Sequence, residues 1–410
     1  MTTSYKKLMA CRICGNVQLE YVLDLGVQVL TGVFPKDPKT KITNGPIQLV
    51  KCVGEVSCCG LLQMAHSYDL DEMYGDNYGY RSGLNQSMVR HLHAKIKRVM
   101  GLVDLSDGAL VLDIGSNDGT SLSAYPTHCV RVGMDPTAAK FRQYYPVDAH
   151  VIPDFFSATK FIENFPNQRA RAVTSFSMFY DLARPMDFVY EVAQILDDEG
   201  VWVFEQSYMP LMLERNSFDT ACHEHLEYYA FKQIHFMLEK AGLKTVDVEF
   251  NDINGGSFSV TAARKSSIYP EYSCVNALLA TELPFDSLQP YHDFAMRSAS
   301  ACEALKHFVK EQKMLGKKIG ALGASTKGNV LLQYCGFTLE DLFAVAEVNP
   351  DKFGSFTPGT LLPIKPDHEV IQLADYLIVL PWHFKDFFLS KYADHAHKLV
   401  FPLPTLSIGR

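Results

Sequence analysis

The sequence predicts an α/β fold built on doubly wound parallel sheets. Strand-like apolar runs alternate with helical stretches twice along the chain, over 109–205 and again over 318–380. That alternation is typical of parallel sheets with helical crossovers. Apolar residues make up 47% of the chain and charged residues 20%, a balance that excludes the disordered class. The length of 410 residues predicts roughly two to four domains.

The charge and hydropathy of the chain bear on its partners and its compartment. Lys and Arg total 38 and Asp and Glu total 46, so the net charge is −8. This charge argues against nucleic acid as a partner, because phosphate binding needs a basic face. No run approaches the ~20 apolar residues of a membrane span, and no signal peptide is recognised. We expect a cytoplasmic protein with no membrane contact, whose 10 cysteines are reduced.

The N-terminal part of the chain predicts a small domain with a metal site. Five cysteines fall in the first 59 residues: Cys11 and Cys14 form a CxxC pair, and Cys52, Cys58 and Cys59 follow. Two separated thiolate pairs in a reduced protein predict a tetrahedral zinc site. We expect one structural zinc held by Cys11, Cys14, Cys52 and Cys59, with Cys58 competing for the fourth position. Plain burial of the thiols is the alternative.

The middle of the chain predicts the first parallel sheet. Residues 83–103 predict a helix, because apolar side chains recur there every four positions. Buried strands are expected at 109–115, 131–134, 172–175 and 201–205, with helices between them.

A glycine-containing loop follows the first of these strands. It holds Gly115, Asn117, Asp118 and Gly119, and glycine lets a backbone approach a ligand without a Cβ clash. The spacing is neither that of a P-loop nor GxGxxG, and NAD is the main rival ligand. Asp135 ends the next strand, where an acid can accept both ribose hydroxyls.

An acid and an aromatic residue complete this pattern. Asp154 and Phe155 offer a carboxylate for an adenine amino group and a ring for the base. The ordered set resembles class I S-adenosylmethionine (SAM) methyltransferases, in which the glycine loop holds the methionine part and the acid holds the ribose. The resemblance implies that SAM contacts Asp113, Gly115, Asn117, Asp118, Gly119, Asp135, Asp154 and Phe155.

A segment dense in titratable groups contains His223, Glu224 and His225. Its spacing is not HExxH, so the zinc-protease interpretation fails. The unperturbed pKa of histidine, ~6.5, allows it to take a proton near neutrality. Tyr228 offers a nearby hydroxyl. A polar helix start with solvated side chains is the alternative.

The C-terminal part predicts a second, smaller α/β unit over about 316–410, after a long helix at 287–314. Its first strand ends in a glycine-containing loop, where a helix N-terminus can bind phosphate. The loop lacks the full dinucleotide fingerprint. We therefore interpret Ser325, Thr326 and Lys327 as contacts for a diphosphate, with a solvated loop lysine as the alternative.

Over essentially its whole length the chain resembles the nucleotide-sugar C-methyltransferases, which make branched deoxysugars. Besides the cysteine cluster, the SAM-type loop and the Glu-His pair, the resemblance includes Asn77-Tyr78-Gly79-Tyr80-Arg81-Ser82-Gly83, Asn254-Gly255-Gly256-Ser257 and Gly323-Ala324-Ser325-Thr326-Lys327-Gly328. It implies a zinc-binding domain at 1–70, a SAM-binding methyltransferase domain at 71–265, and a C-terminal α/β domain at 266–410 that contributes to sugar-nucleotide binding.

The resemblance also implies the reaction. The substrate is a 4-keto-6-deoxyhexose linked to dTDP or GDP, and SAM methylates its carbon 3 through a base-generated enolate. His225 is the implied base, Glu224 its orienting partner, and Tyr80 and Tyr180 are implied enolate donors. The implied substrate contacts are Tyr78, Tyr228, Asn254, Ser325, Thr326 and Lys327.

Two positions depart from the family pattern. Asp181 stands where a characterised relative has a histidine, and Cys222 stands where it has a tyrosine. The alternatives are a SAM-dependent sugar O- or N-methyltransferase of the same fold, a non-enzymatic zinc-dependent binding module, and an NAD-dependent sugar enzyme. The expected partner is the nucleotide-linked keto sugar, with the chain a monomer or a weak homo-oligomer.

Overall fold

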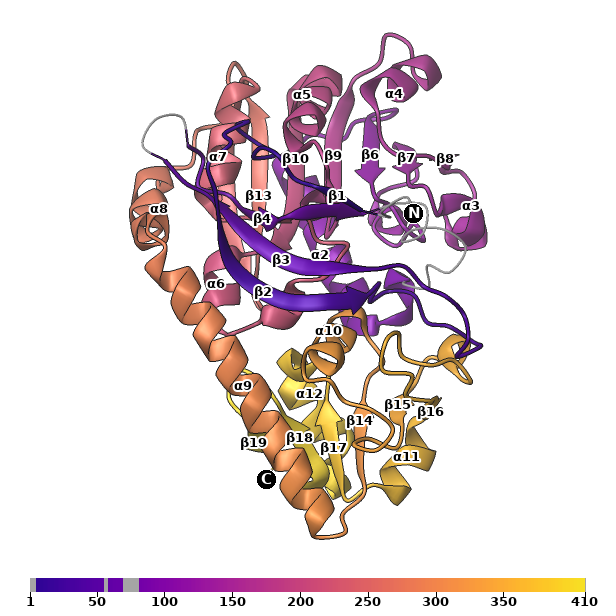
Figure 1. Cartoon of the computed structure of the whole chain (residues 1–410). Helices are drawn as coiled ribbons and strands as arrows, with labels where there is room; N and C mark the ends of the chain where they lie inside the picture. The colour runs from indigo at the N-terminus through magenta and orange to yellow at the C-terminus, as the bar shows by residue number, and fades with distance from the viewer. Residues whose placement is uncertain (1–4, 55–57, 69–80, 410) are drawn as a thin grey trace.

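Four β-sheets organise the chain. The structure, a computed structural model, describes residues 5–54, 58–68 and 81–409. Tyr78 and Tyr80 of the predicted site lie outside the described residues. Two of the sheets are largely parallel and carry helices between their strands, so the predicted α/β class is confirmed (Figure 1).

The largest sheet has seven strands: five are parallel neighbours, and two more are added at one edge through antiparallel pairings. Each predicted strand of the middle region is present. The order of all seven strands across the sheet is β12 (Leu243–Asn251), β13 (Ser257–Arg264), β10 (Leu196–Ser207), β9 (Ala170–Phe176), β6 (Leu110–Ile114), β7 (Val130–Met134) and β8 (His150–Ile152).

The helices of this region cover the sheet with their apolar faces. In α2 (Gln86–Leu102) the buried residues include Met88, Leu92 and Ile96, and Asn85 caps the helix by accepting a hydrogen bond from the Ser87 amide. The predicted helix at 83–103 is therefore confirmed. The other helices are α3 (Ala138–Phe141), α4 (Ala158–Asn164), α5 (Pro185–Ile195), α6 (Met209–Glu214) and α7 (Phe231–Lys240).

The N-terminal strands form antiparallel sheets. They cross the front of the molecule between the larger and the smaller parallel sheet (Figure 1). One sheet has the order β11-β4-β3-β2, and β1 pairs with β5. The strands are β1 (Tyr5–Lys7), β2 (Leu19–Val29), β3 (Asn44–Cys52), β4 (Leu62–Met64), β5 (His66–Tyr68) and β11 (Glu227–Tyr228). The last of these comes from far along the chain, so the N-terminal sheet is completed by the His225 region.

The C-terminal region contains the second parallel sheet. After α8 (Val275–Thr281), the long helix α9 (Gln289–Met314) runs down one side of the molecule (Figure 1). The strand order is β16 (Ile364–Pro366), β15 (Val345–Glu347), β14 (Ile319–Leu322), β17 (Tyr376–Val379), β18 (Leu399–Phe401) and β19 (Ser407–Ile408). Its helices are α10 (Thr326–Tyr334), α11 (Asp367–Leu373) and α12 (Lys385–Lys391). The domain boundaries at 70 and 265 stay predictions.

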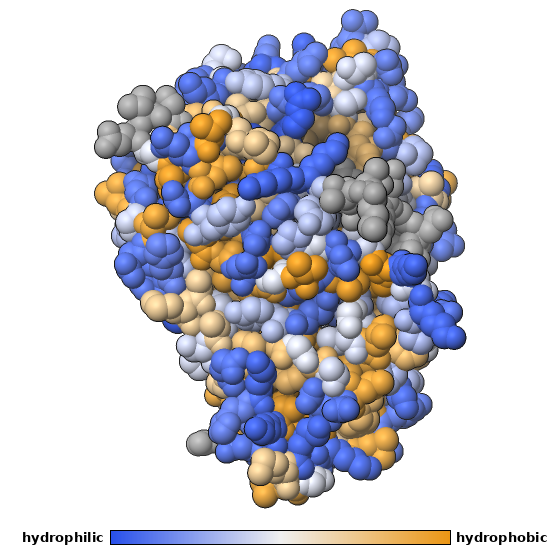
Figure 2. Space-filling view, in the orientation of Figure 1, coloured by the Kyte–Doolittle hydropathy of each residue, from blue (hydrophilic) through white to orange (hydrophobic). Residues whose placement is uncertain are grey.

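One extended apolar core joins residues of all three parts of the chain, from Cys11 through Trp202 to Phe401. On the face shown in Figure 2, hydrophobic residues are interspersed with hydrophilic ones. Among the described residues, no helix is both long enough and apolar enough to span a membrane.

Candidate active site and metal centre

A sharp turn after β6 opens a cavity at the carboxyl ends of the parallel strands. Gly115 adopts φ +70°, and a Cβ there would lie 2.9 Å from the Met178 Cγ. Glycine is therefore required by both conformation and space. Asn117 follows with φ 51°, and its amide donates to Asp135 Oδ2 at 2.9 Å. The turn thus links the ends of β6 and β7.

The cavity encloses about 220 Å³ and collects several of the predicted SAM residues. Asp113, Gly115, Asn117, Asp135 and Phe155 line it. Its further lining consists of Ser82, Met88, Leu92, Ile114, Ser116, Thr120, Ser121, Pro136, Thr137, Phe156, Phe176, Ser177, Met178, Asp181, Leu182, Ala183 and Phe188.

The remaining predicted SAM residues are placed around this cavity. Asp118 accepts a hydrogen bond from the Gly83 amide at 2.9 Å, so it fixes the turn before α2. Gly119 lies against Tyr145. Asp154 pairs with Lys160, and that contact lowers the pKa of the Asp154 carboxyl. These three residues are not among the described residues that line the cavity.

Two buried carboxylates give the cavity its charge. Burial raises the pKa of Asp113 to about 7, against the opposing hydrogen bond from Thr174. Asp135 accepts from the Thr137 amide at 2.6 Å. The glycine turn allows close backbone approach, the acid at the second strand end can accept from ribose hydroxyls, and the exposed Phe155 ring can lie beside a base. The residues present therefore fit SAM.

His225 contacts Tyr180, the chain neighbour of the cavity-lining Asp181, and one of its ring nitrogens is engaged. Its Nδ1 is 2.8 Å from the Thr220 carbonyl oxygen. Because a carbonyl can only accept, Nδ1 carries the hydrogen and Nε2 keeps a lone pair. The ring meets the Tyr180 ring edge to face, with centroids 4.5 Å apart. Burial and then the Lys327 ammonium lower the pKa of His225 to about 3, so the ring is neutral at neutral pH.

The orienting role that the sequence implies for Glu224 stays a prediction, because the hydrogen bond of the His225 ring goes to Thr220. The Thr220 carbonyl occupies Nδ1 of His225. A Cβ on Gly32 would lie 2.1 Å from Glu224 Oε1 and 3.6 Å from Thr326 Oγ1. Burial raises the pKa of Glu224 to about 7. Glu224 therefore lies where the N-terminal strands meet the start of α10.

Tyr228 is also placed differently from the expectation of a substrate contact. It is a buried residue of β11, and its hydroxyl donates to the His225 carbonyl at 3.1 Å. This hydrogen bond braces the loop that carries His225.

The predicted diphosphate residues lie at the start of α10. Ser325 caps α10 by accepting from the Gly328 amide at 3.0 Å. The Lys327 ammonium donates to the Asn254 carbonyl at 3.0 Å, which joins the C-terminal sheet to the loop after β12. Burial lowers the pKa of Lys327, and the Asp219 carboxylate opposes this.

Two further residues of this region, Asp219 and Thr220, were given no role by sequence reasoning. Asp219 is buried and accepts from the Trp382 indole nitrogen at 2.9 Å. Burial and Lys327 lower the pKa of His383 to about 3. Thr220 acts through its backbone carbonyl. No spacing pattern connects residues near 220 with residues near 382, so only the fold brings them together.

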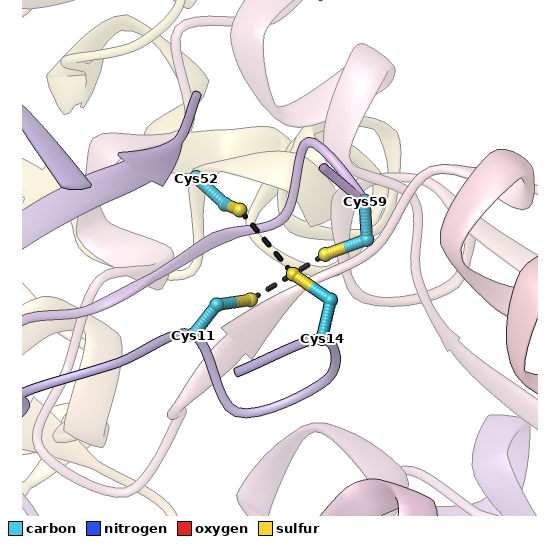
Figure 3. Close-up of side chains that lie close together, drawn as sticks. All are labelled: Cys11, Cys14, Cys52 and Cys59. Carbon is cyan, nitrogen blue, oxygen red and sulfur yellow. Dashed lines mark hydrogen bonds between the residues drawn. The ribbon is translucent and has the colours of Figure 1, made fainter. Parts of the chain in front are cut away.

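Four cysteines converge as the sequence predicts. The sulfur atoms of Cys11, Cys14, Cys52 and Cys59 all lie within 4.8 Å of one another (Figure 3). Cys11 and Cys59 are 3.4 Å apart, and Cys14 and Cys52 are 3.5 Å apart. A Zn–S bond of about 2.3 Å separates sulfurs by about 3.8 Å in a tetrahedron. The cluster therefore fits zinc. Cys58 lies outside it, 3.5 Å from Cys52.

Three family models match successive parts of the chain. A model described as a "zinc binding domain" matches residues 11–74, a "Methyltransferase domain" matches 86–248, and a "C-methyltransferase C-terminal domain" matches 252–404. These matches identify the protein as a SAM-dependent C-methyltransferase. This C-methyltransferase therefore uses SAM and carries a zinc-binding cysteine cluster. The non-enzymatic alternative is excluded.

Relatives of this C-methyltransferase include the C-methyltransferase NovU of Streptomyces niveus. The two are 26% identical over 404 residues, which cover 96% of this chain and 95% of NovU. A chain in the complex between the Haloferax volcanii Trm112 methyltransferase activator and a methyltransferase is 18% identical, with a TM-score of 0.36 over 44% of this chain and 94% of that one. The cyclopropane synthase MmaA2 of Mycobacterium tuberculosis is 18% identical, with a TM-score of 0.31 over 38% of this chain and 62% of that one.

Proposed function

We propose that this C-methyltransferase methylates carbon 3 of a 4-keto-6-deoxyhexose linked to dTDP or GDP. A ketone at carbon 4 acidifies the hydrogen on carbon 3. Removal of that proton leaves its electron pair on an enolate, whose carbon is the nucleophile. The C-methyltransferase family model and the relative NovU support transfer to carbon.

The observation that carries the proposal is the tautomer and the neutral charge of the His225 ring. Its Nδ1 hydrogen is committed to the Thr220 carbonyl, so the Nε2 lone pair is the group that takes the carbon 3 proton. The pKa of His225 is lowered to about 3 by burial and by Lys327. A diphosphate bound near Lys327 offsets that positive charge and raises the proton affinity of the imidazole. General-base help of this kind contributes ~10²–10⁴-fold to turnover.

We assign SAM to the cavity beside the Gly115 turn. When bound, SAM supplies an electrophilic methyl group on a positively charged sulfur. Asp135 binds the ribose hydroxyls, Phe155 lies beside the adenine, and Asp113 lies on the methionine side. Asp181 is a lining residue of the cavity and directly follows Tyr180, which contacts His225. The base is thus close to the place where the methyl group is supplied.

The sugar nucleotide is proposed to lie between this cavity and α10. Lys327, Ser325 and Thr326 bind the diphosphate at the helix N-terminus, and Asn254 lies on the facing loop. Tyr180, which contacts the His225 ring, is our candidate donor of a hydrogen bond to the enolate oxygen.

The domain organisation is part of the proposal. The zinc-binding domain spans 1–70, the methyltransferase domain 71–265 and the sugar-nucleotide domain 266–410. We propose a cytoplasmic protein, because free thiols stay reduced in that compartment. We also propose that it is a monomer or a weak homo-oligomer.

The test is to incubate the purified protein with SAM and a panel of dTDP- and GDP-linked 4-keto-6-deoxyhexoses. NMR spectroscopy of the product locates the new methyl group. We expect a methyl group on carbon 3 with one of these substrates. A methyl group on oxygen or nitrogen would contradict the proposal.

A further inference from the structure

The zinc-binding turn carries an arginine whose side chain points into the protein. Arg12 lies between Cys11 and Cys14, two of the clustered cysteines (Figure 3), and its side chain is 2% exposed. One guanidinium nitrogen donates to the Met64 carbonyl at 2.7 Å and another to the His66 carbonyl at 3.1 Å. Since the guanidinium is a rigid planar fork, these bonds fix the turn against β4 and β5.

The same guanidinium faces a buried carboxylate from the methyltransferase region. Arg12 Nε is 3.5 Å from Glu227 Oε1, and the Glu227 side chain is 0% exposed. Burial raises the pKa of Glu227, and Arg12 opposes that rise. Glu227 pairs with Gln63 across the β11–β4 ladder, and Gln63 Oε1 accepts from the Arg12 amide at 3.1 Å. The Arg12–Glu227 contact and the Gln63 hydrogen bond therefore tie the zinc-binding turn to β11.

His225 is two residues before Glu227, so the Arg12–Glu227 contact bears on the loop that carries His225. The Leu226 carbonyl accepts from the Met64 amide at 2.8 Å, and the Leu226 amide donates to the Tyr180 carbonyl at 2.8 Å. Tyr180 in turn contacts the His225 ring. The backbone next to His225 is therefore held between β4, which Arg12 anchors, and the wall of the SAM cavity.

We propose that Arg12 is a positioning residue that holds the His225 loop in its catalytic geometry through Glu227. The inference rests on the proposed role of His225. A buried ion pair is weak evidence for stability, whereas a displacement of ~1 Å at a reacting group costs ~100-fold in rate. The zinc-binding turn, on this account, is part of the machinery that aligns the base.

The experiment compares Arg12→Met and Arg12→Lys with a matched control, Arg131→Met. Arg131 is also buried, pairs with Asp148 and donates to the Tyr125 carbonyl, but it lies outside the His225 loop. Each variant is measured for zinc content, SAM affinity, and hydrogen–deuterium exchange over residues 222–229 without ligand. Its kcat and KM are measured with the 4-keto sugar nucleotide that the wild type methylates.

We expect Arg12→Met to lower kcat at least ~10-fold and to speed exchange over 222–229 at least ~10-fold. Zinc content and SAM affinity stay near wild type. Arg12→Lys keeps the positive charge without the planar guanidinium, so its kcat and loop exchange rate should lie between those of wild type and Arg12→Met. Arg131→Met loses stability but keeps kcat and the exchange rates of the loop. If Arg12→Met fails to fold, Arg12→Met with Glu227→Met leaves no unpaired buried charge and replaces it.

Unchanged exchange over 222–229, or unchanged kcat, in the Arg12 variants would overturn the positioning role. His225→Asn is measured alongside them. If His225→Asn retains turnover, the assignment of the base is wrong, and the exchange data still report separately whether Arg12 anchors the loop.

Discussion

At the scale of single residues, one backbone hydrogen bond decides the chemistry of His225. The Thr220 carbonyl selects the tautomer with a free Nε2, and burial keeps the ring neutral. His225→Asn retains a similar volume but removes the basic nitrogen. We expect it to lower turnover at least ~100-fold while SAM affinity, measured by calorimetric titration, stays within about twofold. Near-normal turnover would show that another group is the base.

Glu224 offers a residue-scale prediction about stability. Its pKa is about 7 in the folded chain against an ordinary value of 4.5. The folded state therefore binds the proton more tightly. This stabilising contribution is complete below pH 4.5 and is lost as the pH rises through 7.

Glu224→Gln removes that dependence. Urea unfolding should show that wild type loses up to about 3 kcal/mol relative to the variant between pH 4.5 and 7.5. Glu303→Gln, at an exposed site, is the control and should show no such trend. A constant difference between wild type and Glu224→Gln would contradict the raised pKa.

At the scale of elements, the glycine turn after β6 depends on its backbone conformation. Gly119 has φ +76°, and a Cβ there would lie 2.8 Å from the Tyr145 ring. We expect Gly119→Ala to lower the free energy of unfolding by about 1–3 kcal/mol and to weaken SAM binding. In α2, Gly101 has open space around it, so Gly101→Ala should stabilise the protein by about 0.5–1 kcal/mol. Chemical denaturation of both variants checks the contrast.

The strong patterns of the sequence predicted real elements, whereas some real elements are too short to leave a pattern. The fully buried strand β6 and the periodic α2 were predictable because burial of a whole strand or one helix face leaves a local signature. β11, with two residues, leaves none. The cysteine cluster was predictable because few ligand types bind zinc. The partners of His225, Glu224 and Arg12 were not, because each is a contact that only the fold creates.

At the scale of the whole molecule, zinc ties the N-terminal turn to the rest of the chain. The four cysteines come from two segments about 40 residues apart, so the metal closes a loop that the small N-terminal sheet must hold. We expect about one zinc per chain in protein purified without chelators. Removal with a strong chelator should lower the melting temperature. Metal analysis that finds less than about half an equivalent would contradict the zinc site.

The proposed methylation of carbon 3 requires removal of the proton on that carbon. Methyl transfer to oxygen or nitrogen does not. The most direct measurement uses the accepted 4-keto sugar nucleotide deuterated at carbon 3, followed by mass spectrometry of the methylated product. The account predicts that the product has gained a methyl group and lost the deuterium, and that His225→Asn forms little of it. A methylated product that retains the deuterium would contradict the account.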